Sequence, residues 1–117
     1  MQGKIALEEH FSIDETIDGS LSVFPKILWP EITNRLTDLG NRGLQLMDTH
    51  GVQTMILSLN APAIQSIPDP YQASQLAQKA NDFLAEIVSK NPSRFLGFAA
   101  LPMQDPDLAL SLIHISE

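Results

Sequence analysis

Short apolar runs alternate with amphipathic stretches along this chain. The runs at residues 4–10, 52–58 and 94–101 are rich in apolar residues, which is typical of strands buried in a parallel sheet. Residues 31–50 and 69–91 carry apolar positions three and four residues apart, which predicts two helices. Because strands and helices alternate, the sequence predicts right-handed β-α-β units and an α/β fold.

Several residues mark where the helices begin and end. Asp69 is a suitable N-cap with a proline after it, and Asp105 repeats this signal for a last helix. Gly51 is well placed to end the first helix. Gly40 and Gly43 weaken that helix, so they either allow close packing or separate two shorter helices.

Residues 11–30 have no clean period and are predicted to form a long loop, with a short helical turn near 12–15. Long loops in compact domains often serve as lids or binding loops. Val23 or Phe24 is therefore a candidate to cap a ligand pocket, and the alternative is that Phe24 only holds the loop to the core. Asn60 follows the second strand and is either a pocket residue or a turn-forming asparagine.

The first strand ends in a carboxylate and an imidazole two positions apart. Since side chains alternate along a strand, Glu8 and His10 should project to the same side, about 7 Å apart, while Glu9 points the other way. Carboxylate oxygen and imidazole nitrogen can both bind a zinc-type metal ion. The alternative interpretation is an edge strand whose polar end is solvated.

Composition limits the possible functions. The 117 residues suffice for one small domain, and the net charge of −7 argues against nucleic-acid and anionic-membrane partners. There is no cysteine, which excludes disulfides and cysteine-based zinc sites. Two glutamates interrupt the position where a signal peptide would be apolar, and the longest apolar run is too short to span a bilayer. A soluble cytoplasmic protein is expected.

Five stretches of the sequence together carry a family resemblance. They are MQGKIALEEHF at 1–11, LSLNAP at 57–62, IPD at 67–69, AND at 80–82 and RFLGFAALPMQDP at 94–106. In this order they resemble the aromatic-acid decarboxylase branch of the amidohydrolase superfamily. That branch includes the γ-resorcylate, 2,3-dihydroxybenzoate and aminocarboxymuconate-semialdehyde decarboxylases.

The resemblance implies a metal-dependent (β/α)₈ TIM barrel that removes CO₂ from small hydroxybenzoate-type acids without oxidation. It implies that Glu8 and His10 are metal ligands for zinc or manganese, and that the 11–30 loop, through Phe24 or Val23, borders the substrate ring. The metal would hold the substrate, and a nearby acid would protonate the ring carbon. Family members are homo-oligomers, so a homo-oligomer is expected for the full-length form.

The chain also departs from that family. A (β/α)₈ barrel takes about 250 residues, so residues 1–110 are expected to form only about the first three β/α units. Residues 111–117 form an atypical, β-leaning tail that suggests a truncation junction, and His114 fits no family motif. The catalytic residues are expected beyond residue 117.

These departures lead to expectations for the chain by itself. It should be inactive and marginally stable, with an unpaired sheet edge that favours aggregation or pairing. The alternative functions are a metal-dependent hydrolase of the same superfamily and a non-catalytic fragment that associates with a full-length homologue.

Overall fold

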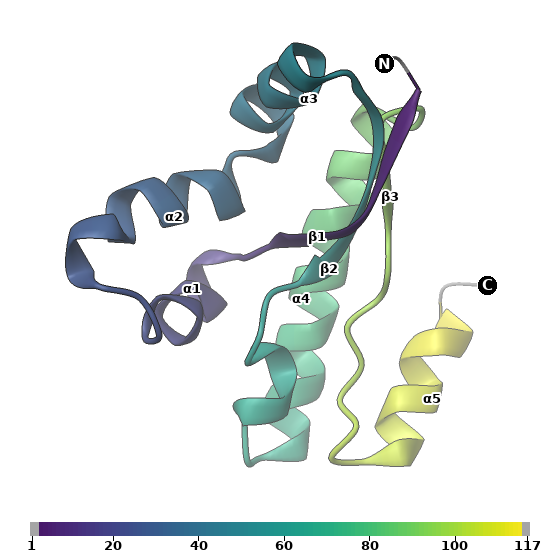
Figure 1. Cartoon of the computed structure of the whole chain (residues 1–117). Helices are drawn as coiled ribbons and strands as arrows, with labels where there is room; N and C mark the ends of the chain where they lie inside the picture. The colour runs from purple at the N-terminus through teal and green to yellow at the C-terminus, as the bar shows by residue number, and fades with distance from the viewer. Residues whose placement is uncertain (1–2, 116–117) are drawn as a thin grey trace.

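The computed structural model describes residues 3–115, which contain a sheet of three parallel strands in the order β1-β2-β3 (Figure 1). The strands are β1 (Lys4–Phe11), β2 (Val52–Leu59) and β3 (Phe95–Gly97). The helices are α1 (Asp14–Leu21), α2 (Trp29–Thr37), α3 (Leu44–His50), α4 (Pro70–Lys90) and α5 (Pro106–Ile115). The predicted α/β fold is confirmed, with the strand order of the first three β/α units of a (β/α)₈ barrel.

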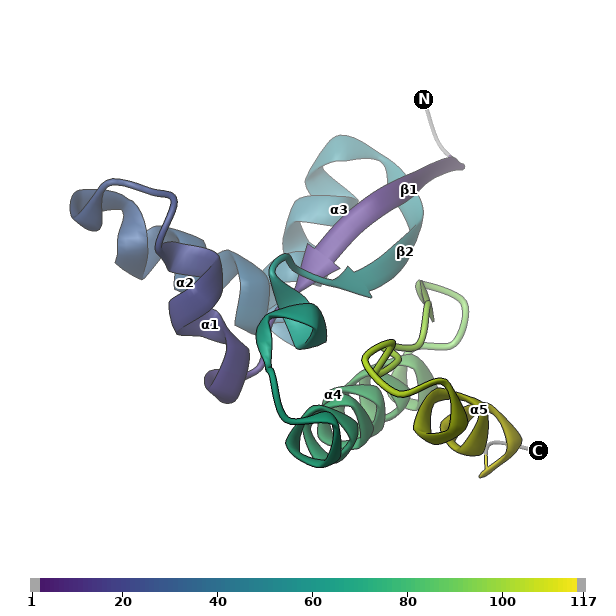
Figure 2. The same ribbon diagram turned by 90° about the horizontal axis from the view of Figure 1, so that it is seen from below.

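The sheet is covered unevenly. Helix α4 packs along the sheet and α5 lies beside α4, whereas α1 and α2 lie beyond the carboxyl end of β1 (Figures 1 and 2). Large apolar side chains of β1 and of the segment after β3 remain open to solvent: Ile5 is 66% exposed, Leu7 61% and Phe98 60%. The sheet therefore presents apolar side chains to solvent. No helix within residues 3–115 has the length and apolar character needed to cross a membrane.

Helix α4 is the main partner of the sheet. The Asp69 carboxylate accepts a hydrogen bond from the backbone N–H of Tyr71 at 3.2 Å, which confirms Asp69 as the N-cap. The ring of Phe83 stacks on Phe11 with the centroids 5.8 Å apart. Around this pair lie the buried apolar side chains of Ile13, Leu39, Met47, Leu57, Ala80, Leu84 and Phe95. Packing of Phe11 thus fixes the end of β1 one residue after His10.

The helix predicted at residues 31–50 is interrupted. Helix α2 ends at Thr37, a wide turn, η2 (Leu39–Gly43), follows, and α3 begins at Leu44. The glycines therefore separate two shorter helices, which was one of the two alternatives. Gly51 ends α3 with a φ of +70°, a conformation that glycine adopts without a steric penalty.

An ion-pair network joins α2 to the turn η2. The Glu31 carboxylate accepts hydrogen bonds from Arg35 Nε at 2.8 Å and from Arg42 Nη1 at 3.1 Å. Arg42 Nη1 also donates to Asn34 Oδ1 at 2.6 Å. The Arg42 guanidinium, with Arg35 as the second contributor, lowers the pKa of Glu31 to about 2.

This network makes a prediction for acid solution. Because the folded-state pKa of Glu31 is depressed, its contribution to stability is present above about pH 4.5 and disappears as the pH falls towards 2. An NMR titration should find Glu31 titrating near pH 2, and the Arg42→Gln variant should raise that value. A Glu31 midpoint in the ordinary range, unchanged by Arg42→Gln, would show that the network does not form.

The prediction of a long loop at residues 11–30 is wrong in part, because most of this segment is helical. Helix α1 begins where the Thr16 hydroxyl contacts both the backbone N–H and the carbonyl of Ile13, each at 3.2 Å. A short 3₁₀ turn, η1 (Lys26–Leu28), then leads into α2. Local hydrogen bonds of a side chain mark the start of α1. The prediction relied on apolar periodicity, which does not reveal such bonds.

The third strand and the last helix also differ from expectation. Strand β3 spans three residues instead of 94–101, and further along the chain the backbone of Ala100 is hydrogen-bonded to the Asn81 side chain. The Asn81 amide accepts from the Ala100 N–H at 2.7 Å and donates to its carbonyl at 2.9 Å.

Helix α5 continues to Ile115, so the apolar string at 111–115 is helical rather than extended. The last two tail residues lie outside the described residues.

Candidate metal-binding edge of the sheet

Three polar side chains occur where β1 and β2 end. Glu8 and His10 lie in the last part of β1, and Ser58 lies in the last part of β2 as the register partner of His10. The Nδ1 atom of His10 is 3.1 Å from Ser58 Oγ, which is a hydrogen bond. Active sites on parallel α/β sheets form at this carboxyl edge.

A β-bulge gives Glu8 and His10 their direction. Ala6 pairs with Met55 and Glu9 with Leu57, so β1 advances three residues while β2 advances two. The extra residue changes which positions of β1 are open: Leu7 and Glu8 are both exposed. From there the alternation resumes, with His10 exposed and Phe11 buried. Bulges beside active sites commonly redirect side chains in this way.

The donor chemistry of this edge fits a divalent metal ion. A carboxylate oxygen of Glu8 and Nε2 of His10 are suitable ligands, and the bond from Nδ1 to Ser58 is the kind that orients a metal-binding imidazole. Catalytic zinc sites usually have three protein ligands. Residues 3–115 contain no group of three or more His, Cys, Asp or Glu side chains able to hold one ion. Glu8 and His10 are thus an incomplete set within the described part of the chain.

The other candidate residues lie in turns. The Asn60 backbone N–H donates to the carbonyl of Phe11 at 2.8 Å, and its side chain donates to the carbonyl of Ala61 at 3.1 Å, as in a turn-forming asparagine. Val23 is 79% exposed and Phe24 41%, in the segment between α1 and η1. Trp29 Nε1 donates to the Phe24 carbonyl at 3.0 Å and holds this segment in place.

Two buried hydroxyl groups just after the end of β1 and in α1 were missed in the sequence. Ser12 Oγ lies 3.1 Å from Ser20 Oγ, and Ser20 Oγ donates to the Ala61 carbonyl at 3.3 Å. Both serines are at most 1% exposed. They connect the end of β1, helix α1 and the loop after β2. Serines in an irregular stretch gave no periodic signal that could have revealed this network.

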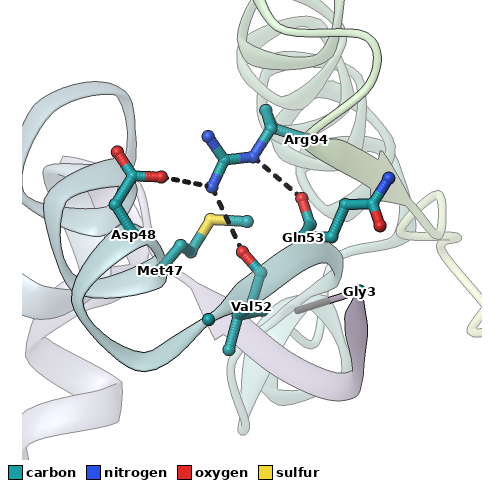
Figure 3. Close-up of a pocket in the computed structure, with 7 residues that line it drawn as sticks. Gly3, Met47, Asp48, Val52, Gln53 and Arg94 are labelled. Atoms are coloured by element: carbon teal, nitrogen blue, oxygen red, sulfur yellow. Dashed lines mark hydrogen bonds and ion pairs between the residues drawn. The ribbon is translucent and has the colours of Figure 1, made fainter. Parts of the chain in front are cut away.

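Two cavities lie at opposite ends of the strands. A cavity of about 290 Å³ at the carboxyl edge is lined by Ser58, Phe98 and Met103 among others. A larger one of about 410 Å³ lies at the amino ends, beside Gly3, Val52 and Arg94 (Figure 3). The larger cavity is remote from Glu8 and His10, and in barrels conservation at that end reflects stability rather than chemistry.

Arg94 has a structural role at the amino ends of the strands. Its Nε donates to the Gln53 carbonyl at 2.8 Å, while Nη2 donates to Asp48 at 2.8 Å and to the Val52 carbonyl at 3.1 Å (Figure 3). These bonds tie the start of β3 to α3 and to the start of β2. The hydrogen-bonding capacity of the Arg94 guanidinium is thus largely taken up by these structural contacts.

Solved structures of aromatic-acid decarboxylases share this fold over nearly the whole chain. A 2,6-dihydroxybenzoate decarboxylase, solved with 2,6-dihydroxybenzoate, matches with a TM-score of 0.94 and 55% identity over 97% of this chain and 35% of its own. A dihydroxybenzoic acid decarboxylase from Polaromonas sp., solved with manganese and the inhibitor 2-nitroresorcinol, matches with a TM-score of 0.93 and 57% identity over 97% and 34%. The fold of this chain is therefore similar to about a third of each of these decarboxylases, one of which was solved with manganese.

The sequence comparison is equally specific. A γ-resorcylate decarboxylase from Polaromonas sp. is 60% identical over 109 residues, which are 93% of this chain and 33% of that protein. No family model matches the chain. The chain spans about a third of the length of the curated relatives it matches. It is thus similar, almost from end to end, to one third of a γ-resorcylate decarboxylase.

Proposed function

We propose that this chain provides the first β/α units of a metal-dependent, non-oxidative decarboxylase of hydroxybenzoate-type acids, with Glu8 and His10 as two metal ligands. The observation that carries the proposal is the exposure of both side chains at the carboxyl edge of the sheet, in a chain that is 60% identical over 109 residues to a γ-resorcylate decarboxylase. No catalytic acid is assigned within this chain.

The proposed metal is manganese, since one similar structure was solved with manganese, and zinc is the alternative. A bound divalent ion supplies Lewis acidity and a template for the carboxylate and adjacent hydroxyl of the substrate. Glu8 contributes a negatively charged oxygen and His10 a neutral nitrogen. Because the chain carries a net charge of −7, a bound cation would offset its repulsion of an anionic acid.

The substrate side of the site is proposed to use apolar surface. Val23 and Phe24 are exposed between α1 and η1 and can border an aromatic ring, as the resemblance implies. Asn60 is a weaker candidate, because its amide already donates within its own turn. The cavity beside Ser58 and Phe98 offers a further apolar wall at the same edge. A cytoplasmic location stays a prediction from the sequence.

A chimera tests this function directly. Residues 1–110 would replace the matching segment of the Polaromonas γ-resorcylate decarboxylase, and CO₂ release from γ-resorcylate would be measured with Mn²⁺. We expect kcat/KM within about tenfold of the parent enzyme, a change of about 1.4 kcal/mol in the activation free energy. A chimera that folds and oligomerises like the parent but shows no turnover would contradict the proposal.

Association with a homologous chain is a second candidate, favoured by the exposed Ile5, Leu7 and Phe98. Co-purification of the chain with the Polaromonas enzyme, unchanged by chelator and by Glu8→Gln, would support it. The chimera separates the two candidates, because a purely associating module would give no metal-dependent turnover.

A further inference from the structure

We infer that Ser58 is the positioning residue for His10: it accepts a hydrogen bond from Nδ1–H of His10 and thereby directs Nε2 towards the metal. The inference rests on the proposed function, because it concerns the same site. It adds a residue from the neighbouring strand and specifies which nitrogen of His10 binds.

The geometry of the two strands brings these side chains together. His10 and Ser58 are register partners on parallel strands, and their side-chain atoms are 3.1 Å apart. Leu57, the residue before Ser58, is fully buried, so alternation turns Ser58 to the opposite face of β2. The bulge in β1 leaves His10 on the open face as well. The register therefore brings the two side chains within hydrogen-bonding reach of each other.

The surroundings hold both residues in place. Immediately after the pair, the Asn60 N–H donates to the Phe11 carbonyl at 2.8 Å, which locks the register of the strand ends. Phe11 is 1% exposed and is fixed by the core. The buried Ser12–Ser20 contact follows two residues after His10 along the chain. Ligands supported by packing and hydrogen bonds keep the orientation that a metal requires.

The direction of the bond follows from the chemistry of imidazole. A neutral ring has one N–H and one free lone pair. If Nε2 donates its lone pair to a metal, Nδ1 carries the proton, and the bond must run from His10 to the Ser58 oxygen. A hydroxyl accepts this bond, whereas an alanine methyl group cannot. With a metal on Nε2, Ser58 thus accepts the Nδ1–H bond and holds the imidazole ring in the orientation that points Nε2 away from β2, a role that partners outside the ligand set commonly have.

Zn²⁺ titrations of the 117-residue chain with ¹⁵N-labelled histidine test the inference at pH 8. In the unmodified chain, long-range ¹H–¹⁵N spectra should show Zn²⁺ on Nε2 of His10 and the proton on Nδ1. Ser58→Ala should weaken Zn²⁺ binding at least tenfold and allow coordination through either nitrogen. Ser58→Thr, which keeps the hydroxyl, should restore both properties, and Ser66→Ala, an exposed serine outside the site, should leave them unchanged.

The outcomes separate this inference from the proposed function. Coordination of Nε2 with equal affinity in the unmodified chain, Ser58→Ala and Ser58→Thr would overturn the role of Ser58 and leave the metal ligands intact. Loss of affinity in Ser58→Thr as large as in Ser58→Ala would also overturn it. If His10 binds no Zn²⁺ in any variant while the amide spectrum shows a folded chain, the inference is overturned, and the metal proposal is decided separately by the chimera, in which the rest of the barrel is present.

Discussion

Replacing Glu8 by Gln or His10 by Asn in the chimeric decarboxylase is expected to lower kcat/KM about 1,000-fold, because each change removes a ligand from a Lewis-acid centre worth several kcal/mol. Both side chains are exposed at the strand end, so neither substitution opens a hole in the core. The protein should therefore remain folded while activity and bound manganese fall together. Turnover and metal content of the purified variants measure the effect.

The chain contains a matched control for each substitution. Glu9 is the sequence neighbour of Glu8 but is partly buried, and His50 is an exposed histidine at the end of α3. Glu9→Gln and His50→Asn should keep kcat/KM within about threefold of the chimera, which is under 1 kcal/mol. Equal losses in the Glu8 and Glu9 variants would show that the direction set by the bulge does not decide which carboxylate binds.

Gly97→Ala is expected to destabilise the fold by about 1–3 kcal/mol, because the added methyl group overpacks the core. A Cβ at this position would lie 2.3 Å from Leu84 Cδ2 and 2.8 Å from Leu84 Cγ. Leu84 is 5% exposed and sits on α4, whose packing holds β3 in the sheet. Urea unfolding of the chain, followed by far-ultraviolet circular dichroism, gives the change in free energy.

A double-mutant cycle makes this prediction more specific. Leu84→Ala alone should cost about 2–5 kcal/mol by leaving a cavity, and part of that cavity is the space that the new methyl group needs. The double variant should therefore be more stable than the sum of the two losses by about 1 kcal/mol or more. Gly40→Ala is the control, because nothing lies within 4 Å of its added Cβ. Additive losses, or equal losses at positions 97 and 40, would contradict the contact.

The parts of the fold that the sequence predicted well depend on local signals. The helix beginning after Asp69 has a long apolar stripe and a capping carboxylate, and both features act within a few residues of their own position. Gly51 likewise ends α3 by its own conformation. The segment after His10 was predicted poorly, because Thr16 and the buried Ser20 form α1 through individual hydrogen bonds that no periodicity reveals.

The candidate site likewise has features that local sequence signals predicted and features that they did not. The alternation of a strand predicted Glu8 and His10 on one side, and the structure shows both as exposed. The bulge before Glu9 could not be predicted, because it depends on the register between β1 and β2, which a single strand does not specify. Ser58 was counted only as part of an apolar run, and its contact with His10 exists only once the two strands are paired.

The central claim is that Glu8 and His10 hold one divalent metal ion at the carboxyl edge of the sheet. A crystal structure of the chimera grown with Mn²⁺, with anomalous diffraction recorded above the manganese edge, tests it most directly. We expect a single strong anomalous peak about 2.0–2.3 Å from a Glu8 oxygen and from Nε2 of His10. A fully occupied manganese peak bound by other residues, with Glu8 and His10 both unligated, would contradict the claim.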